Sequence, residues 1–283
     1  MTRLFPILAG TFKLDGGAMF GVVPRTLWER LNPPDDKNLC TWALRCLLVV
    51  TDQRKILIDT GIGIKQDEKF MSHFYPSKHL LHEKIAEAGF DSSEITDVFL
   101  THLHFDHCGG ALDKANDGTI IPAFPNATYW TCKSHFDWAL NPNARERASF
   151  LKENIIYLTD RGILKFIPEV QYSAWFDGIT IFFAYGHTEA MMIPMIPFGD
   201  TTVAFCADLL PSSYHVGMPY VMSYDIRPLT TLEEKSRFFE RMYSEKSVLF
   251  LEHDPQHECI KLTRDERGRY TVGEYLTVES LSS

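Results

Sequence analysis

Short apolar runs that end in polar residues recur along this chain and predict β-strands followed by loops. The runs Leu44–Val50 and Lys55–Asp59 are separated by the turn-like segment Thr51–Arg54, so they predict a β-hairpin. Asp97–Thr101 predicts a short buried strand. Three later runs predict further strands: Ile179–Tyr185, Thr202–Ala207 and Val248–Leu251.

Two other segments have the pattern of helices. Leu80–Ala88 has apolar residues at helical intervals, and Gly89 after it is suited to end a helix. The run Thr231–Glu234 is a capping-box pattern, which predicts a helix that begins there and continues to about Tyr243. Because no repeat, low-complexity tract or linker interrupts these elements, residues 1–283 are expected to form one domain.

The composition is that of an ordinary globular protein. The chain has 283 residues, of which 45% are hydrophobic and 23% are charged, and a chain of this length can bury a sizeable core. Its formal net charge is −9, so nucleic acid and anionic membrane surfaces are poor candidates as partners. Bound divalent cations would offset part of that charge locally.

The cysteines and the N-terminal residues indicate in which cellular compartment the protein is expected. The six cysteines have no CxxC spacing and are expected to be free, mostly buried thiols, which favours a reducing, cytoplasmic location. The first ten residues lack the length and cleavage site of a secretory signal. No run approaches the roughly 18 apolar residues of a membrane span.

The densest group of potential metal ligands lies between Thr101 and Gly110. His102, His104, Asp106 and His107 fall within six residues, directly after a predicted strand. Imidazoles with a carboxylate suit a hydrolytic Zn, Mn or Fe site. Two histidines spaced two apart in extended backbone share a face and can chelate one ion, while the next aspartate and histidine can face a second. Solvated loop histidines are a poor explanation for so many ligands in one short run.

Further candidates stand at the ends of other predicted strands, namely Asp59, His187, Asp208 and His253. Rigid strands that present polar side chains at their ends are a common way to preorganise a site. Thiolate ligation by Cys108 or Cys206, which lie near these candidates in sequence, is a minor alternative. The remaining histidines lack partner spacing and are expected at the surface or in packing: His73, His79, His82, His135 and His257.

The run from His102 to His107, followed by two glycines, resembles the HxHxDH signature of the metallo-β-lactamase superfamily. Asp59 before Thr-Gly, His187 in Gly-His-Thr, Asp208 and His253 match the other motifs of that family, in the same order. The resemblance implies an α/β fold, a four-layer αββα sandwich in which two mixed sheets are flanked by helices.

The resemblance also implies a ligand set. One metal ion would be held by His102, His104 and His187, a second by Asp106, His107 and His253, with Asp208 bridging the two. The cofactors would be two divalent ions, zinc first, with Mn, Fe or Co as alternatives. Asp59 would lie behind the ligands and accept the N–H of a ligand imidazole.

The leading hypothesis for function is a hydrolase that opens a lactone ring. The intact ligand set, Phe105 within the motif and the glycine-punctuated segment Asp15–Pro24 resemble the quorum-quenching acyl-homoserine lactonase branch. That branch implies attack by a metal-bridging hydroxide on a small ester or lactone, with Asp106 or Asp208 as the proton carrier. The alternatives are a phosphodiesterase or organophosphate triesterase, and then a β-lactamase. A non-enzymatic metal-binding protein is disfavoured because no ligand is missing.

Substrate contacts are predicted at six residues, namely Met19, Phe20, Phe105, Tyr214, His215 and Tyr220. The resemblance departs at Pro211, because related lactonases often carry a tyrosine three residues after the bridging aspartate. Tyr214 or Tyr220 would replace that tyrosine if the loop folds back. The hydrophobic N-terminal loop could equally form a homodimer interface.

Overall fold

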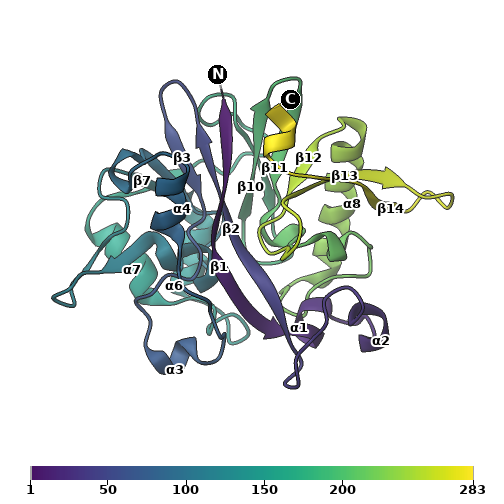
Figure 1. The fold of residues 1–283 in the computed structure, drawn as a ribbon, viewed down its shortest axis with the longest axis horizontal. Helices are drawn as coiled ribbons and strands as arrows, with labels where there is room; N and C mark the ends of the chain where they lie inside the picture. The colour runs from purple at the N-terminus through teal and green to yellow at the C-terminus, as the bar shows by residue number, and fades with distance from the viewer. Residues whose placement is uncertain (1, 283) are drawn as a thin grey trace.

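Two six-stranded mixed β-sheets face each other and carry helices on their outer faces in the computed structural model, which describes residues 2–282 (Figure 1). The strand orders are β1-β2-β3-β4-β7-β8 and β14-β13-β12-β11-β10-β9. The expected four-layer αββα sandwich is confirmed.

The first sheet combines an antiparallel half and a parallel half. Strands β1, β2 and β3 pair antiparallel, whereas β3, β4, β7 and β8 pair parallel. The predicted hairpin is β2–β3, in which Val50 pairs with Lys55. The strands are β1 (Arg3–Asp15), β2 (Leu39–Val50), β3 (Lys55–Ile58), β4 (Asp97–Phe99), β7 (Thr128–Cys132) and β8 (Leu164–Ile167).

The second sheet is antiparallel except for the central pair β11–β12. Its strands β9, β11 and β12 fall on the three later runs predicted as strands. The strands are β9 (Thr180–Ala184), β10 (Met191–Phe198), β11 (Thr201–Phe205), β12 (Val248–Phe250), β13 (Cys259–Arg264) and β14 (Tyr270–Leu276). A separate two-stranded ribbon is formed by β5 (Leu112–Lys114) and β6 (Ile120–Pro122).

Helices cover both outer faces, with α4, α6 and α7 on the side of the first sheet and α8 on the side of the second (Figure 1). The α-helices are α1 (Gly16–Phe20), α2 (Arg25–Trp28), α3 (Glu68–Met71), α4 (Leu81–Glu87), α5 (Phe105–Cys108), α6 (Lys133–Leu140), α7 (Lys152–Asp160) and α8 (Pro228–Ser244). Short 3-10 turns are η1 (Ser92–Glu94), η2 (Gly109–Ala111), η3 (Ala207–Leu209), η4 (Ser213–His215) and η5 (Glu279–Ser282). No helix within residues 2–282 is both long and apolar enough to cross a membrane.

Strand alternation divides the core into two clusters. Ile56 and Ile58 of β3 point between the sheets, while Leu57 points toward the helices of the first sheet. This is the two-residue period of a strand that is buried on both faces. On the other side, Phe238 and Phe239 of α8 pack against the second sheet.

The predicted start of the last helix is wrong. Helix α8 begins at Pro228, where a proline in the first turn loses no hydrogen bond. Thr231 therefore lies inside the helix, and its hydroxyl donates back to the carbonyl of Arg227. Glu234 does not cap α8, because its carboxylate accepts from the backbone N–H groups of Tyr185 and Gly186 at 2.8 and 3.0 Å.

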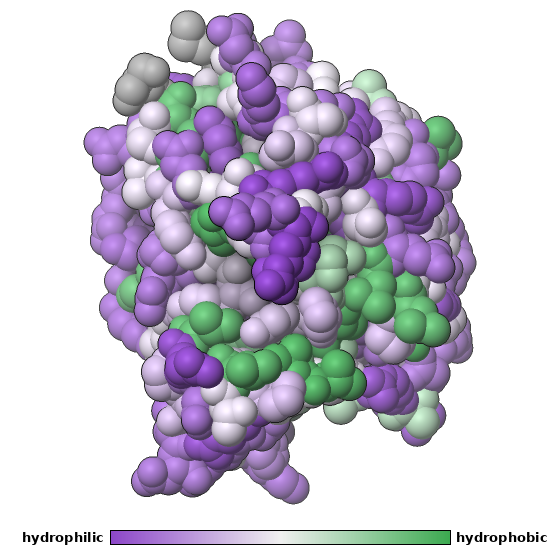
Figure 2. Space-filling model, turned by 90° about the vertical axis from the view of Figure 1, so that its right-hand side faces the viewer, coloured by the Kyte–Doolittle hydropathy of each residue, from purple (hydrophilic) through white to green (hydrophobic). Residues whose placement is uncertain are grey.

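The face that carries α8 and the α1–α2 segment is mostly hydrophilic, and its hydrophobic side chains gather in the lower part of the view (Figure 2). Val22 and Leu229, from these two regions, are 88% and 74% exposed. The predicted homodimer stays a prediction.

Candidate metal centre

The loops after β4, β9, β11 and β12 bring the seven predicted ligands into two adjacent groups. His102, His104, His187 and Asp208 form the first group, and Asp106, His107 and His253 form the second. All seven side chains are buried. The sequence prediction that these residues meet is therefore supported by the geometry.

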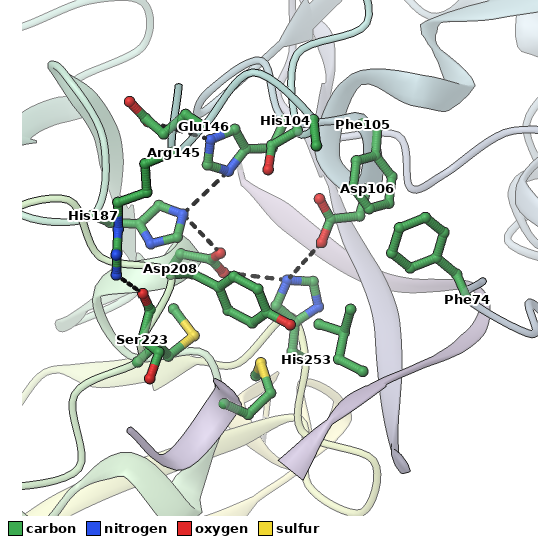
Figure 3. A pocket seen from close by; sticks show the side chains of 16 residues that line it. Phe74, His104, Phe105, Asp106, Arg145, Glu146, His187, Asp208, Ser223 and His253 are labelled. Atoms are coloured by element: carbon green, nitrogen blue, oxygen red, sulfur yellow. Dashed lines mark hydrogen bonds and ion pairs between the residues drawn. The ribbon is translucent and has the colours of Figure 1, made fainter. Parts of the chain in front are cut away.

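In the first group, three imidazole nitrogens point at one another. Nδ1 of His104 lies 3.1 Å from Nε2 of His102 and 3.2 Å from Nε2 of His187. The carboxylate oxygen Oδ2 of Asp208 lies 3.1 Å from Nε2 of His187 (Figure 3).

In the second group, Nε2 of His107 lies 3.2 Å from Nε2 of His253. Oδ2 of Asp106 lies 3.8 Å from each of these nitrogens. Oδ1 of Asp208 lies 3.2 Å from Nε2 of His253, and Oδ2 lies 3.1 Å from Nε2 of His187 and 3.6 Å from Nε2 of His107, so this carboxylate contacts both groups. Asp208 is thus placed to bridge.

These separations fit metal ions. Ligands of a tetrahedral ion with bonds of about 2.0–2.1 Å lie about 3.3 Å apart. Neutral imidazoles whose ring nitrogens converge at 3.1–3.2 Å cannot all donate to one another, whereas a shared cation satisfies every lone pair. Oδ1 of Asp208 is buried and accepts no hydrogen bond from residues 2–282, although Nε2 of His253 lies 3.2 Å away. The residues present therefore suit divalent cations.

Buried acceptors fix the ligand imidazoles from behind. Nδ1 of His107 lies 3.0 Å from carboxylate oxygens of both Asp59 and Glu252, and Nδ1 of His187 lies 2.8 Å from Oδ1 of Asp225. Asp59 is itself held by the backbone N–H and hydroxyl of Thr101. Such contacts select the tautomer that offers Nε2 to a metal. Asp59 therefore lies where its expected role requires, and that role stays a prediction.

The other three ligand imidazoles have different partners behind them. Nδ1 of His102 lies 3.1 Å from the hydroxyl oxygen of Thr101. Nδ1 of His253 lies 2.8 Å from the carbonyl oxygen of Ala43 on β2. His104 is reversed, because its Nδ1 faces the other ligands and its Nε2 faces Oε1 of Glu146 at 3.6 Å. Glu146 comes from the loop between α6 and α7, so that loop takes part in orienting a ligand.

The buried carboxylates have different electrostatic environments. Burial raises the pKa of Glu252 to about 8, partly offset by His107, while the nearby Asp59 adds to the increase. Burial also raises the pKa of Glu146, but His104 and the hydrogen bonds from Thr188 and Trp138 outweigh burial and lower that pKa to about 2. Glu146 is therefore ionised at neutral pH.

Helix α8 holds two of the site loops through adjacent residues. Glu234 accepts from the backbone that leads into His187. Lys235 is 1% exposed, and its ammonium donates to the carbonyl oxygens of His215, Gly217 and Tyr220. These bonds fix the chain between Asp208 and the pocket wall.

Both ligand groups open onto one pocket of about 340 Å³ (Figure 3). One part of its wall is apolar and consists of Leu14, Met19, Phe74, Phe105 and Met222. The rings of Phe74 and Phe105 lie 4.5 Å apart. The polar part, apart from the ligands, contains Arg145, Glu146, Ser149, Ser223 and Tyr224. A substrate with one apolar end therefore fits this pocket.

Comparison with known proteins agrees with this architecture. Residues 45–121 match the family described as the Metallo-beta-lactamase superfamily. The chain is 23% identical to the N-acyl homoserine lactonase AiiA of Bacillus thuringiensis subsp. kurstaki, an alignment that covers 90% of this chain and 94% of that protein.

Two solved structures share the fold. A probable metal-dependent hydrolase from Staphylococcus aureus has a TM-score of 0.87 at 25% identity, covering 97% of this chain and 96% of that one. The dizinc quorum-quenching lactonase AidC has a TM-score of 0.77 at 23% identity, covering 98% and 96%.

The chain thus resembles the metallo-β-lactamase superfamily, and its lactonases in particular.

Four of the predicted substrate contacts lie away from the pocket, and these predictions are corrected. Phe20, His215, Tyr214 and Tyr220 pack behind it with Trp28 and Trp42 in an aromatic cluster. His215 stacks on Phe20 at 5.0 Å, and its ring nitrogens bond to Ser212 and to the carbonyl of Met19. The loop turns these side chains inward because they bury more apolar surface there. Met19 and Phe105 do line the pocket.

The two cysteines weighed as ligands are also placed elsewhere. Both thiols are buried and weakly bonded to backbone carbonyls, Cys108 to Leu103 and Cys206 to Ala204. All six cysteines are free and buried, as expected. His135, expected in packing, accepts from the backbone N–H of Leu103 at 2.8 Å and so supports the ligand loop.

Four residues that surround the ligands or line the pocket were not singled out from the sequence, namely Glu146, Tyr224, Asp225 and Glu252. Only Glu252 could have been found from the sequence, because it stands beside the candidate ligand His253 at the end of a predicted strand. The other three lie in irregular loops, where periodicity says nothing about side-chain direction.

Proposed function

We propose that this protein is a binuclear metal-dependent hydrolase that opens a lactone ring of the N-acyl-homoserine lactone type. The observation that carries the proposal is the pair of adjacent ligand groups at the floor of a half-apolar pocket. The similarity to AiiA and AidC, which are lactonases, supports this substrate class over others.

The proposed ions are zinc, held by the two ligand groups with Asp208 between them. Divalent ions in such a site supply an activated water and polarise the substrate carbonyl. The remaining roles belong to side chains. Asp106 turns one oxygen, Oδ2, toward His107 and His253, which leaves Oδ1 to carry a proton from the attacking water to the leaving oxygen.

Tyr224 is the residue that we place against the substrate carbonyl, in the role considered for Tyr214 or Tyr220. It lines the pocket, and burial together with Asp15, Asp106 and Asp208 raises the pKa of its phenol. The hydroxyl therefore stays protonated and can donate a hydrogen bond. The apolar wall around Phe74 and Phe105 would receive an acyl chain and exclude water from the ligands.

A substrate panel with a matched pair of variants tests the proposal. Protein loaded with Zn, Mn or Co is assayed on acyl-homoserine lactones, simple esters, β-lactams, phosphotriesters and phosphodiesters. Lactone turnover should dominate, and Asp106→Asn should abolish most of it. Tyr224→Phe removes one hydrogen bond and should lower kcat about 10- to 100-fold. Tyr214→Phe, in the aromatic cluster, is the control and should change kcat little. Strong phosphoester turnover without lactone turnover would replace this proposal with the phosphoesterase alternative.

Quorum quenching and a cytoplasmic location stay predictions. Both would be examined in cells, by the loss of acyl-homoserine lactone from culture medium on expression and by fractionation.

A further inference from the structure

Arg145 is the only lysine or arginine among the described residues that line the pocket (Figure 3). Its Nη2 donates to the backbone carbonyl oxygens of Ser223 and Asp225, the latter at 3.4 Å, on a loop that also lines the pocket. At its other end, the backbone of Arg145 adjoins Glu146, which is 2% exposed and held by Thr188, Trp138 and Asn143. Arg145 is exposed, but its guanidinium is held by these two carbonyl oxygens and its backbone adjoins a buried residue.

The charge of this guanidinium is not paired within residues 2–282. No carboxylate lies within ion-pair distance, and Nε and Nη1 have no hydrogen-bond partner there. An arginine has five N–H donors, and Nη2 carries only two of them. Several donors therefore remain for a molecule in the pocket.

The nearby acidic groups are already engaged. Glu146 accepts from Thr188 at 2.6 Å and from Trp138 at 2.8 Å, and Asp208 faces both ligand groups. A permanent cation fixed beside a cavity, with free donors and no protein counter-ion, is suited to an anionic group of a ligand.

The position of Arg145 sets the orientation of such a ligand. Arg145 adjoins Glu146, which faces His104, and its guanidinium reaches the loop of Asp225, which contacts His187. An acidic group would thus lie on the His104–His187 side, and an apolar group would lie toward Phe74.

We propose that Arg145 is a specificity-determining residue that binds a carboxylate of the substrate, so that the preferred lactones or esters carry an acidic group. The inference rests on the proposed hydrolase function and narrows it. Among lactones of the proposed type, those that carry an acidic group would use this charge and turn over faster than otherwise equal neutral ones.

The test compares two substrates and two variants. The substrates are a lactone with a carboxylate substituent and the same lactone with a carboxamide. Arg145→Gln removes the pocket charge, and Arg147→Gln makes the same charge change at an exposed arginine of the same loop that does not line the pocket. Wild type and Arg147→Gln should both prefer the lactone with the carboxylate. Arg145→Gln should lower kcat/KM for that lactone about 10- to 100-fold and change kcat/KM for the carboxamide lactone by no more than about threefold.

A binding measurement separates this inference from the proposed function. Calorimetric titration of hexanoate and hexanamide into metal-loaded wild type, Arg145→Gln and Arg147→Gln should show a preference for hexanoate that falls about 10-fold in Arg145→Gln alone, because any binding of the carboxylate to the ions is common to all three. If neither lactone is hydrolysed but the binding difference holds, the lactonase proposal fails and acid recognition stands. Equal binding of the two ligands by wild type, or equal losses on both substrates in Arg145→Gln, would overturn the inference.

Discussion

Replacing Asp225 by Asn tests whether His187 is a metal ligand whose basicity is raised by the carboxylate of Asp225. Asp225 is 2% exposed, and its Oδ1 lies 2.8 Å from Nδ1 of His187. Asn keeps an oxygen acceptor in the same place but removes the negative charge. Because a charged acceptor makes the ligand imidazole more basic, loss of such a partner weakens metal binding about 10- to 100-fold.

The structure places the expected loss near the lower end of that range. In the metal-free protein burial disfavours the imidazolium of His187, but Asp208 and Asp225 outweigh burial and raise its pKa to about 10. A metal must therefore displace a proton at neutral pH. Asp225→Asn also lowers that proton affinity, which offsets part of the loss. We expect about a 10-fold weaker first ion, or about 1.4 kcal/mol.

Competition against a chromogenic chelator at pH 7.5 measures the stepwise affinities. Asp225→Ala, which leaves Nδ1 without an acceptor, should lie nearer a 100-fold loss. Asp200→Asn is the matched control, because it makes the same charge change at an exposed turn. If both Asp225 variants bind two ions as tightly as wild type, the ligand role of His187 is refuted.

Three further outcomes are expected. Asp106→Ala or His253→Ala should reduce bound metal to about one ion per chain by elemental analysis and abolish most turnover. Gly109→Ala should destabilise the fold by about 3 kcal/mol in urea, because a Cβ there would lie 2.1 Å from the carbonyl oxygen of Ile62. The pKa of Glu146 is lowered from 4.5 to about 2, so its stabilisation is present above pH 4.5 and is lost as pH falls toward 2. The stability gap between metal-free wild type and Glu146→Gln, at most about 3 kcal/mol, should therefore close over that range in pH-dependent denaturation; a constant gap would contradict this.

The strands that lead to the ligands could be predicted from sequence, whereas β10 could not. Its apolar run contains Pro194 and Pro197, and prolines argue against a central strand. The structure accommodates both prolines because the two halves of β10 pair with different neighbours. Pro194 lies where β10 pairs with β9, and Pro197 lies where β10 pairs with β11. At each proline, the other edge of the strand therefore has no paired strand.

The ligands themselves could be predicted because their motifs follow regular strands, but the substrate wall could not. The direction of Tyr224 and of His215 depends on contacts far away in sequence. Lys235 holds the carbonyls between them, and Met19 accepts from His215. Periodicity carries no information on such contacts, and this is why the predicted aromatic contacts proved to be packing.

The division of ligands between the two sheets has a consequence for assembly. Four ligands follow β4 of the first sheet, and three follow β9, β11 and β12 of the second. Neither sheet alone presents a complete site, because Asp208 and the histidines around it belong to different halves of the sandwich. If ions bind as proposed, their uptake requires the two sheets to be packed together, and their binding free energy stabilises that packing. A chelator should loosen the contact between the sheets before it disturbs either sheet.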